Sequence, residues 1–496
     1  MNDVSGSAAQ SPESSGSMSR SVAKSAAWTT GANAARIASG ILVIPVLARF
    51  LQPSDFGIMQ IAMPVVLFLM MFGDLGFGPA LVRAKQVSNA AWSSVFWVTL
   101  AIGALLSILL YLASAPVASW FRHPEATPIL QVLSCMLVLG CFNVTPAALL
   151  QRRLRFDQLA MLEVFSVGLG IAAALFGAIR GAGAWALVWQ QLTMFIIKTV
   201  GLWALGRPPI RFAIDIGALE DLFGFSMNLL ASRIVNFFSR NVDNVLIGRM
   251  LGAASLGYYS IAYRILLMPV EIFAWGLSQI LIPTIGKFQD NKPRVQAACL
   301  RTYRLISAMT FPAMTGIAVL AYPIVSVLLG ERMMPAAPVL QILAPIGALQ
   351  SVSTTQGSIN VALGRADIVF GWSLLSLIVV TIGFAVGVNF GLMETALSYL
   401  VATLILAPPY YARVMRLIDL TLVDFLKALS QPFSGSLIMA AVLIAANSVL
   451  PAGTPDFVRL VTLIPLGVAT YGASMFLLNR QLVFELIGIA KDIISR

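Results

Sequence analysis

Residues 41–63 of the chain read ILVIPVLARFLQPSDFGIMQIAM, and residues 241–263 read NVDNVLIGRMLGAASLGYYSIAY. Each stretch has the pattern of a helix end, a tight loop containing glycine, and the start of another helix. The residues that recur 200 positions later are Arg49, Leu51, Gly57, Ile61 and Ala62. This spacing predicts an internal duplication in which corresponding helices follow one another in the same order.

A second pair of segments supports the duplication. Residues 126–133 read ATPILQVL and residues 336–343 read AAPVLQIL, now at an offset of 210 positions. At that offset Arg155 also matches Arg365, just after the same helix. We expect the repeat to contain six helices. Because an even number of spans preserves orientation, the two halves should run parallel and be related by an axis along the membrane normal.

The composition places these helices in a lipid bilayer. The chain has 496 residues, of which 58% are hydrophobic and 11% are charged, and its mean hydropathy is +0.87. Soluble domains carry roughly 25% charged residues, so a chain this long and this poor in charge cannot cover itself with polar surface in water. We therefore predict an all-α integral membrane protein.

A transmembrane helix needs ~20 mostly apolar residues, and about fourteen segments meet this condition. The expected organisation is a disordered cytoplasmic tail (1–21), an N-lobe of helices 1–6 (22–213), a C-lobe of helices 7–12 (214–416), and helices 13 and 14 with a second tail (417–496). The predicted spans are 26–50, 56–80, 90–113, 127–150, 160–180, 184–205, 222–250, 256–283, 300–320, 336–360, 368–390, 393–412, 430–450 and 457–479.

The Lys and Arg residues of the loops indicate the orientation. Cytoplasmic loops carry an excess of these residues, and most of the loop cations fall on the side of the N-terminus, alternating from loop to loop. We expect a multi-pass protein of the bacterial inner membrane with both termini in the cytoplasm. The net charge of +11 is explained by these loops, and no polar segment is long enough for a nucleic-acid domain. The cluster Arg152, Arg153 and Arg155 is expected to contact anionic lipid headgroups.

Metal and cofactor sites are not expected. The three cysteines, Cys135, Cys141 and Cys299, lie in apolar stretches without the spacing of a metal site or a disulfide. His123 is the single histidine and lies in a short predicted loop. The sequence also lacks a Walker motif, so this chain is not expected to hydrolyse ATP.

Charged and polar side chains inside the predicted helices form the candidate site, because a charge in the bilayer costs at least ~2.5 kcal/mol. Asn33 and Arg36 lie on one face of helix 1, and the repeat places them at the depth of two residues of helix 7. Helix 7 has four such side chains, 3, 4 and 3 residues apart and hence on one face: Arg233, Asn236, Arg240 and Asp243.

Further intramembrane charges are Arg264, Glu271, Asp74 and Lys198. One interpretation is pairing within helices, Arg240 with Asp243 and Arg264 with Glu271, while Asp74 and Lys198 extend to the membrane interface. Pairing leaves a surplus of arginine in helices 1, 7 and 8, which suits an anionic substrate because the planar guanidinium matches phosphate. The remaining alternative is that Asp243, Glu271 or Asp74 binds a coupling H⁺ or Na⁺.

Aromatic residues also cluster near helix 8, at Tyr258, Tyr259, Tyr263 and Trp275. These rings are suited either to stacking on sugars or to an interfacial aromatic belt. The belt is the favoured interpretation.

Residues 242–264, VDNVLIGRMLGAASLGYYSIAYR, resemble the polysaccharide-exporting flippases of the Wzx type, in the multidrug/oligosaccharidyl-lipid/polysaccharide exporter (MOP) superfamily. The first-half stretches ARFLQPSDFG (48–57) and FGDLGFGPALV (72–82) are also typical of that family. In length and helix number the chain looks most like the colanic-acid or xanthan type. The residues that carry the likeness are Asp243, Gly248, Leu251, Gly252, Leu256, Gly257, Tyr259, Ala262, Tyr263 and Arg264.

The resemblance implies a MATE-like fold, in which two six-helix lobes surround a central cavity lined by helices 1, 2, 7 and 8. It implies a substrate, an undecaprenyl-diphosphate-linked oligosaccharide, that crosses the inner membrane by alternating access for exopolysaccharide, capsule or O-antigen (lipopolysaccharide) synthesis. By family analogy Arg36, Arg233 and Arg264 would contact the diphosphate or acidic sugars. Expected partners are this substrate, membrane lipids and the polysaccharide polymerase or export machinery.

Two other functions compete with this interpretation. A MATE-like drug/cation antiporter should have an acidic cavity, whereas this chain has excess arginine there. A membrane enzyme of the same pathway would need a large periplasmic loop with catalytic groups, and the longest predicted loop on that side is short.

Overall fold

The computed structural model describes residues 43–288, 291–451, 453–485 and 488. Its regular structure in these residues is helical throughout, as the sequence predicts. In the first half the helices are α2 (Pro53–Asp74), α3 (Phe77–Arg83), α4 (Asn89–Trp120), α5 (Ala126–Leu133), α6 (Cys135–Phe142), α7 (Val144–Arg152), α8 (Phe156–Ile179) and α9 (Ala184–Gly206).

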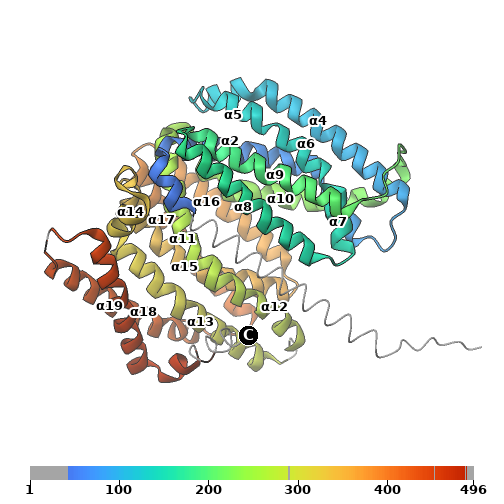
Figure 1. The fold of residues 1–496 in the computed structure, drawn as a ribbon. Coiled ribbons are helices and arrows are strands. Elements are labelled where there is room, and N and C mark those ends of the chain that lie inside the picture. The colour runs from blue at the N-terminus through green and yellow to red at the C-terminus, as the bar shows by residue number, and fades with distance from the viewer. Residues whose placement is uncertain (1–42, 289–290, 452, 486–487, 489–496) are drawn as a thin grey trace, which may run out of the picture.

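The second half continues with longer helices, and Figure 1 shows the whole set as one bundle. They are α10 (Ile216–Met250), α11 (Gly252–Pro269), a π-helical turn (Val270–Trp275), α12 (Gly276–Phe288), α13 (Lys292–Val319), α14 (Ala321–Leu329), a short 3₁₀ turn (Glu331–Met333), α15 (Ala336–Ala362), α16 (Ala366–Gly387), α17 (Leu392–Leu417), α18 (Leu422–Val449) and α19 (Asp456–Leu478).

Ten helices of the described residues are long and apolar enough to cross a membrane, or eleven if α13 and α14 form one span. The chain is thus a multi-pass membrane protein. Every predicted span from 56–80 onward overlaps an observed helix. The lower count has a physical reason, because α9 and α10 contain charged and amide side chains that lower their hydropathy, and most of predicted helix 1 lies outside the described residues. The number fourteen remains a prediction.

Several predicted spans are interrupted rather than straight. The span Ala126–Arg152 is divided into α5, α6 and α7, and α11 passes through the π-helical turn directly after Pro269. Proline removes a backbone donor and so favours such a break. Predicted helix 300–320 corresponds to α13, and an 80° bend at its end leads into α14, which no predicted span included.

Helices α2 and α11 touch through their backbones. A Cβ atom built on Gly57 would lie 1.7 Å from the carbonyl oxygen of Ala253, and one built on Gly257 would lie 1.9 Å from that of Pro53. The contact is reciprocal, because Gly57 and Gly257 correspond in the repeat and so do their partners, Pro53 and Ala253. We call these four residues the glycine seam. It is the arrangement expected of two halves related by a twofold axis.

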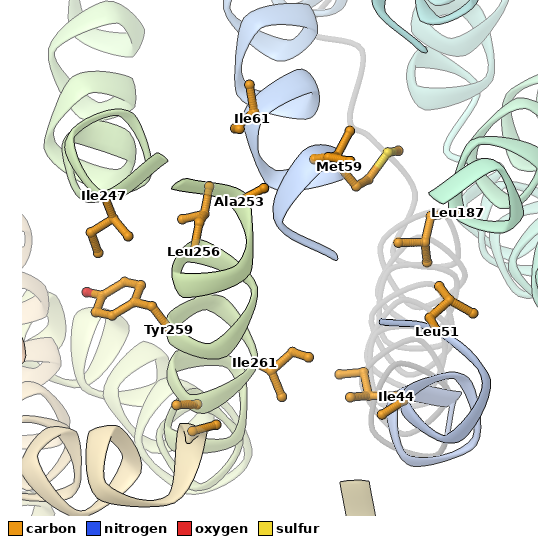
Figure 2. Packing of buried hydrophobic residues seen from close by; sticks show 14 of the residues in the cluster. Ile44, Leu51, Met59, Ile61, Leu187, Ile247, Ala253, Leu256, Tyr259 and Ile261 are labelled. Atoms are coloured by element: carbon orange, nitrogen blue, oxygen red, sulfur yellow. The ribbon is translucent and has the colours of Figure 1, made fainter. Parts of the chain in front are cut away.

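Apolar side chains surround the glycine seam and join the two halves. The largest buried cluster contains Ile61 of α2 together with Ile247, Leu256 and Ile261 of α10 and α11. Figure 2 shows Ala253 and Leu256 beside α2, near Ile61. The hydrophobic core is therefore continuous across the duplication.

Helices α18 and α19 lie at the outer edge of the bundle, beside α13 (Figure 1). Leu443 and Leu463 are buried against Leu320 at the end of α13. An apolar cavity of about 560 Å³ lies between these helices, lined in part by Met309 and Tyr471. This pair therefore packs on one side of the bundle, outside the duplicated halves.

Candidate functional site

Two cavities contain the charged side chains of the membrane interior. The first, of about 480 Å³, lies among α2, α3, α6, α7, α9 and α10; we call it the Arg233 cavity. Its polar lining residues are Asp74, Asn143, Gln151, Lys198 and Arg233.

The second cavity, of about 440 Å³, lies among α2, α8, α9 and α11 and residues 43–47; we call it the Arg264 cavity. Leu67 lines both cavities, so they are neighbours. Its polar lining residues are Gln60, Glu163, Gln190, Gln191, Ser260 and Arg264.

An ion pair between α2 and α10 lines the Arg233 cavity. Nη1 of Arg233 lies 3.0 Å from Oδ2 of Asp74, with 37% and 24% of the two side chains exposed. Asp74 Oδ1 also accepts a hydrogen bond of 3.1 Å from the backbone N–H of Gly78, in the first turn of α3. The neighbouring helix thus supplies Asp74 with a guanidinium partner, and its extension to the membrane interface stays a prediction.

Lys198 also has a partner from another helix. Its Nζ lies 2.6 Å from Oε2 of Glu163 in α8, with 42% and 30% of the side chains exposed. Interfacial extension of Lys198 likewise stays a prediction. Our sequence analysis did not single out Glu163, although the same cost of intramembrane charge applies to a carboxylate within predicted span 160–180.

The proposed intrahelical pairs are not among the ion pairs of the described residues. Asp243 accepts a 2.8 Å hydrogen bond from the backbone N–H of Asn244. Arg240 and Glu271 are exposed, and Glu271 lies in the π-helical turn, where regular helical spacing no longer applies. Arg264 is instead a wall residue of its cavity.

The side chains of three predicted site residues are not described by the structure. Asn33 and Arg36 lie outside the described residues. For Asn236 only the helical backbone is described. Their placement at the cavities stays a prediction.

The tyrosines of α11 are packed inside the bundle rather than in an interfacial belt. Tyr259 is 1% exposed, and its ring stacks on Tyr263 with centroids 5.9 Å apart. Gln350 of α15 donates hydrogen bonds to the hydroxyls of Tyr399 (2.9 Å) and Tyr263 (3.3 Å). Trp275, by contrast, is 57% exposed. The polar partners come from α15 and α17, which no local sequence pattern relates to α11.

A histidine from the first half contacts the start of α11. The backbone N–H of Ala253 donates a 2.9 Å hydrogen bond to Nε2 of His123. The other ring nitrogen, Nδ1, lies 2.9 Å from Oε1 of Glu125, so the proton of the neutral ring is on Nδ1. The hydrogen bond from His123 lowers the pKa of Glu125. The histidine that the sequence left without a role therefore joins the two halves.

Two arginines related by the repeat make contacts next to the seam. Nη2 of Arg49 donates a 3.2 Å hydrogen bond to the carbonyl oxygen of Val327, in the second half. The Arg249 guanidinium lies over the ring of Trp120 in the first half, 5.4 Å from its centroid. Each half therefore extends an arginine onto the other, and the glycine-seam end of the bundle is closed by several contacts.

The described residues contain no group of three or more His, Cys, Asp or Glu side chains that could hold a metal ion. Their three cysteines are free thiols, with Cys141 and Cys299 buried. What these cavities offer is paired charge and amide groups, which are suited to a polar ligand.

Comparison with known proteins gives the family. A model of the family described as "Polysaccharide biosynthesis protein" matches residues 46–338. The succinoglycan biosynthesis transport protein ExoT of Rhizobium meliloti (strain 1021) is 28% identical over 476 residues, covering 95% of this chain and 96% of that protein. The lipopolysaccharide biosynthesis protein WzxC of Escherichia coli (strain K12) is 25% identical over 393 residues, covering 76% and 80%.

A solved structure has the same fold. The lipid II flippase MurJ, in an inward closed conformation, matches with a TM-score of 0.76 at 15% identity, covering 92% of this chain and 99% of that one. At this identity the likeness concerns the fold alone. The resemblance noted for residues 242–264 is confirmed by the family match, and the chain therefore belongs to the polysaccharide biosynthesis protein family of Wzx-type membrane transporters.

Proposed function

We propose that the chain is a flippase for undecaprenyl-diphosphate-linked oligosaccharide repeat units in the bacterial inner membrane. The observation that carries this proposal is the presence of Arg233, Lys198 and Arg264 in the walls of two adjacent intramembrane cavities. A charged side chain within a membrane-spanning helix is costly, and Arg233 and Lys198, although paired, remain partly exposed to their cavity. Phosphate is the ligand that an arginine fork matches best.

The amide side chains of the Arg264 cavity support a sugar-containing substrate. Gln60, Gln190 and Gln191 come from two helices and line the same space. Each amide both donates and accepts hydrogen bonds, as hydroxyl-rich sugars require. Arg36, Asn33, Asn236 and Arg240 are proposed to extend this surface from helices 1 and 7.

We propose that transport follows alternating access between a first-half lobe (22–213) and a second-half lobe (214–416). With the termini in the cytoplasm, the glycine seam is at the periplasmic end. Asp74 ends α2 about 25 Å away at 1.5 Å per residue, so the Arg233 cavity is near the cytoplasmic end. The sugar-diphosphate head would enter there while the polyprenyl tail stays in lipid, and rocking of the lobes would open the seam.

Charge reversal tests the binding surface. Arg36→Glu, Arg233→Glu and Arg264→Glu should each abolish polymer export in a strain that lacks its own exporter, while the protein remains at normal membrane levels. Arg332→Glu, in the exposed 3₁₀ turn, is the matched control and should export normally. Normal export by all three cavity variants would show that the binding site is elsewhere.

Coupling to H⁺ or Na⁺ through Asp243, Glu271 or Asp74 is the proposed energy source. Transport into vesicles should then slow when both gradients are collapsed. Unchanged rates without gradients would exclude this coupling, and downhill movement of the lipid-linked substrate would suffice.

A further inference from the structure

The Lys198–Glu163 ion pair lies between the two cavities. Lys198 lines the Arg233 cavity, whereas Glu163 lines the Arg264 cavity. The 2.6 Å contact between Nζ and Oε2 therefore joins the wall of one cavity to the wall of the other. The pair is accessible from both sides, so a ligand that enters either cavity meets one of its members.

Both cations of the Arg233 cavity have the same kind of partner. Arg233 pairs with a carboxylate of α2 and Lys198 with a carboxylate of α8. Between 24% and 42% of each of the four side chains is exposed, which leaves them open to ligands. Partly solvated pairs of this kind contribute little net stability, so an anion can replace either carboxylate at small cost.

The two carboxylates can each do without their cation. Asp74 keeps the hydrogen bond from the Gly78 backbone, at the start of α3, when Arg233 leaves it. Glu163 faces the Arg264 cavity, where Arg264 and three glutamines line the wall. Neither carboxylate is left buried without polar surroundings.

We propose that Lys198 and Arg233 form a two-cation site for the diphosphate of the substrate, and that Glu163 and Asp74 are exchangeable counter-ions that occupy this site when it is empty. This inference rests on the proposed function and adds Lys198 and Glu163 to it. A diphosphate diester carries two negative charges, one for each cation. Arg233 supplies a planar fork and Lys198 a mobile point charge, a combination that accommodates two differently oriented phosphates.

Single substitutions of the two partners distinguish exchange from a purely structural ion pair. Glu163→Gln removes a competitor for Lys198 and should tighten binding of undecaprenyl diphosphate about fivefold, whereas Lys198→Gln should weaken it about fivefold. Lys198→Arg should retain binding. A structural pair predicts loss of stability in both variants, with binding changed in the same direction or not at all.

The measurement is native mass spectrometry of the purified full chain titrated with undecaprenyl diphosphate, with neutral undecaprenol as the reference lipid. The inference is supported if the two substitutions change the dissociation constant for undecaprenyl diphosphate in opposite directions and leave that for undecaprenol unaffected. The inference is overturned if both substitutions change the dissociation constant for diphosphate in the same direction, or if the constants for the two lipids change equally. Where Lys198→Gln yields no stable protein, Glu163→Gln alone decides, since unchanged or weaker diphosphate binding overturns the inference. A wild-type protein that does not prefer diphosphate over undecaprenol would instead overturn the proposed function.

Discussion

At the scale of single residues, the glycine seam shows why two positions cannot carry a side chain. The backbone carbonyls of Ala253 and Pro53 occupy the places where Cβ atoms of Gly57 and Gly257 would be. Close approach of helices through small residues is a common basis of packing within membranes, where lipid supplies no hydrophobic driving force between helices. The identity of these residues therefore sets the distance between the two halves.

Gly57→Ala should lower the thermal stability of the purified protein, because the new methyl group must displace a carbonyl group of the backbone. Overpacking of this kind costs about 1–3 kcal/mol. The measurement is the midpoint of thermal unfolding in detergent. Gly168→Ala is the matched control in α8, where a Cβ atom meets nothing within 4 Å and alanine favours the helix. Equal midpoints for the two variants would contradict the packing argument.

Charged residues illustrate the limit of local sequence patterns. Spacings of three and four residues suggested pairs within one helix, Arg240 with Asp243 above all. The structure pairs Asp74 with Arg233 and Lys198 with Glu163, residues 159 and 35 positions apart. Identifying the charged positions was possible from the cost of burial; identifying partners was not, since this depends on which helices pack together.

At the scale of elements, the apolar runs predicted where helices lie but not where they bend. Segment 300–320 was expected to be one helix and lies in α13, but the 80° bend that follows it into α14 was not anticipated. The turn places Val327 within reach of Arg49 from the other half. A bend of this kind costs backbone hydrogen bonds and is stabilised by tertiary contacts, which hydropathy does not contain.

The start of α11 should depend on His123. In His123→Ala the amide of Ala253 loses its acceptor, and loss of a capping interaction costs ~1 kcal/mol. Hydrogen exchange of the peptide over residues 252–256 should then become about fivefold faster.

The start of α15, at residues 336–340, is the internal control for this measurement. It lies beyond the 3₁₀ turn and does not contact His123 by any hydrogen bond of the described residues, so its exchange should be unchanged. Equal exchange at 252–256 in both proteins would show that the histidine does not stabilise this helix end.

At the scale of the whole molecule, the contacts at the seam end are those that the proposed alternating access would separate. The glycine seam, the His123–Ala253 hydrogen bond and the Arg49–Val327 hydrogen bond all join the first half to the second. The Asp74–Arg233 pair joins them near the other end. Alternating access requires that the contacts at one end of the bundle break while those at the other end persist.

Cross-linking the seam end should therefore block transport. A short bis-maleimide reagent applied to Arg49→Cys/Val327→Cys, in a chain with exposed Cys135 replaced by serine, should join the halves and abolish polymer export. Each single cysteine variant should still export after the same treatment. Normal export by fully cross-linked protein would contradict alternating access at this end.

The sequence by itself determined the class of the protein and predicted a duplication. Low charge and long apolar runs require lipid as solvent, so helices that satisfy their own backbone groups are the available structure. The repeated residues also anticipated the seam, since Gly57 and Gly257 are a matched pair in the two quoted stretches. These properties follow from local or periodic patterns of residues, which the sequence alone contains.

Only the tertiary structure decided which side chains meet. Glu163 entered the proposed site because Lys198 lies opposite it on α9. Tyr259 proved to be core because α10 and α15 pack against α11 and the ring of Phe384 meets its own. His123 gained a role from Ala253, 130 positions away. The physical reason is that a hydrogen bond or ion pair acts over about 3 Å, and the packing of helices, rather than the order of residues, brings atoms that close.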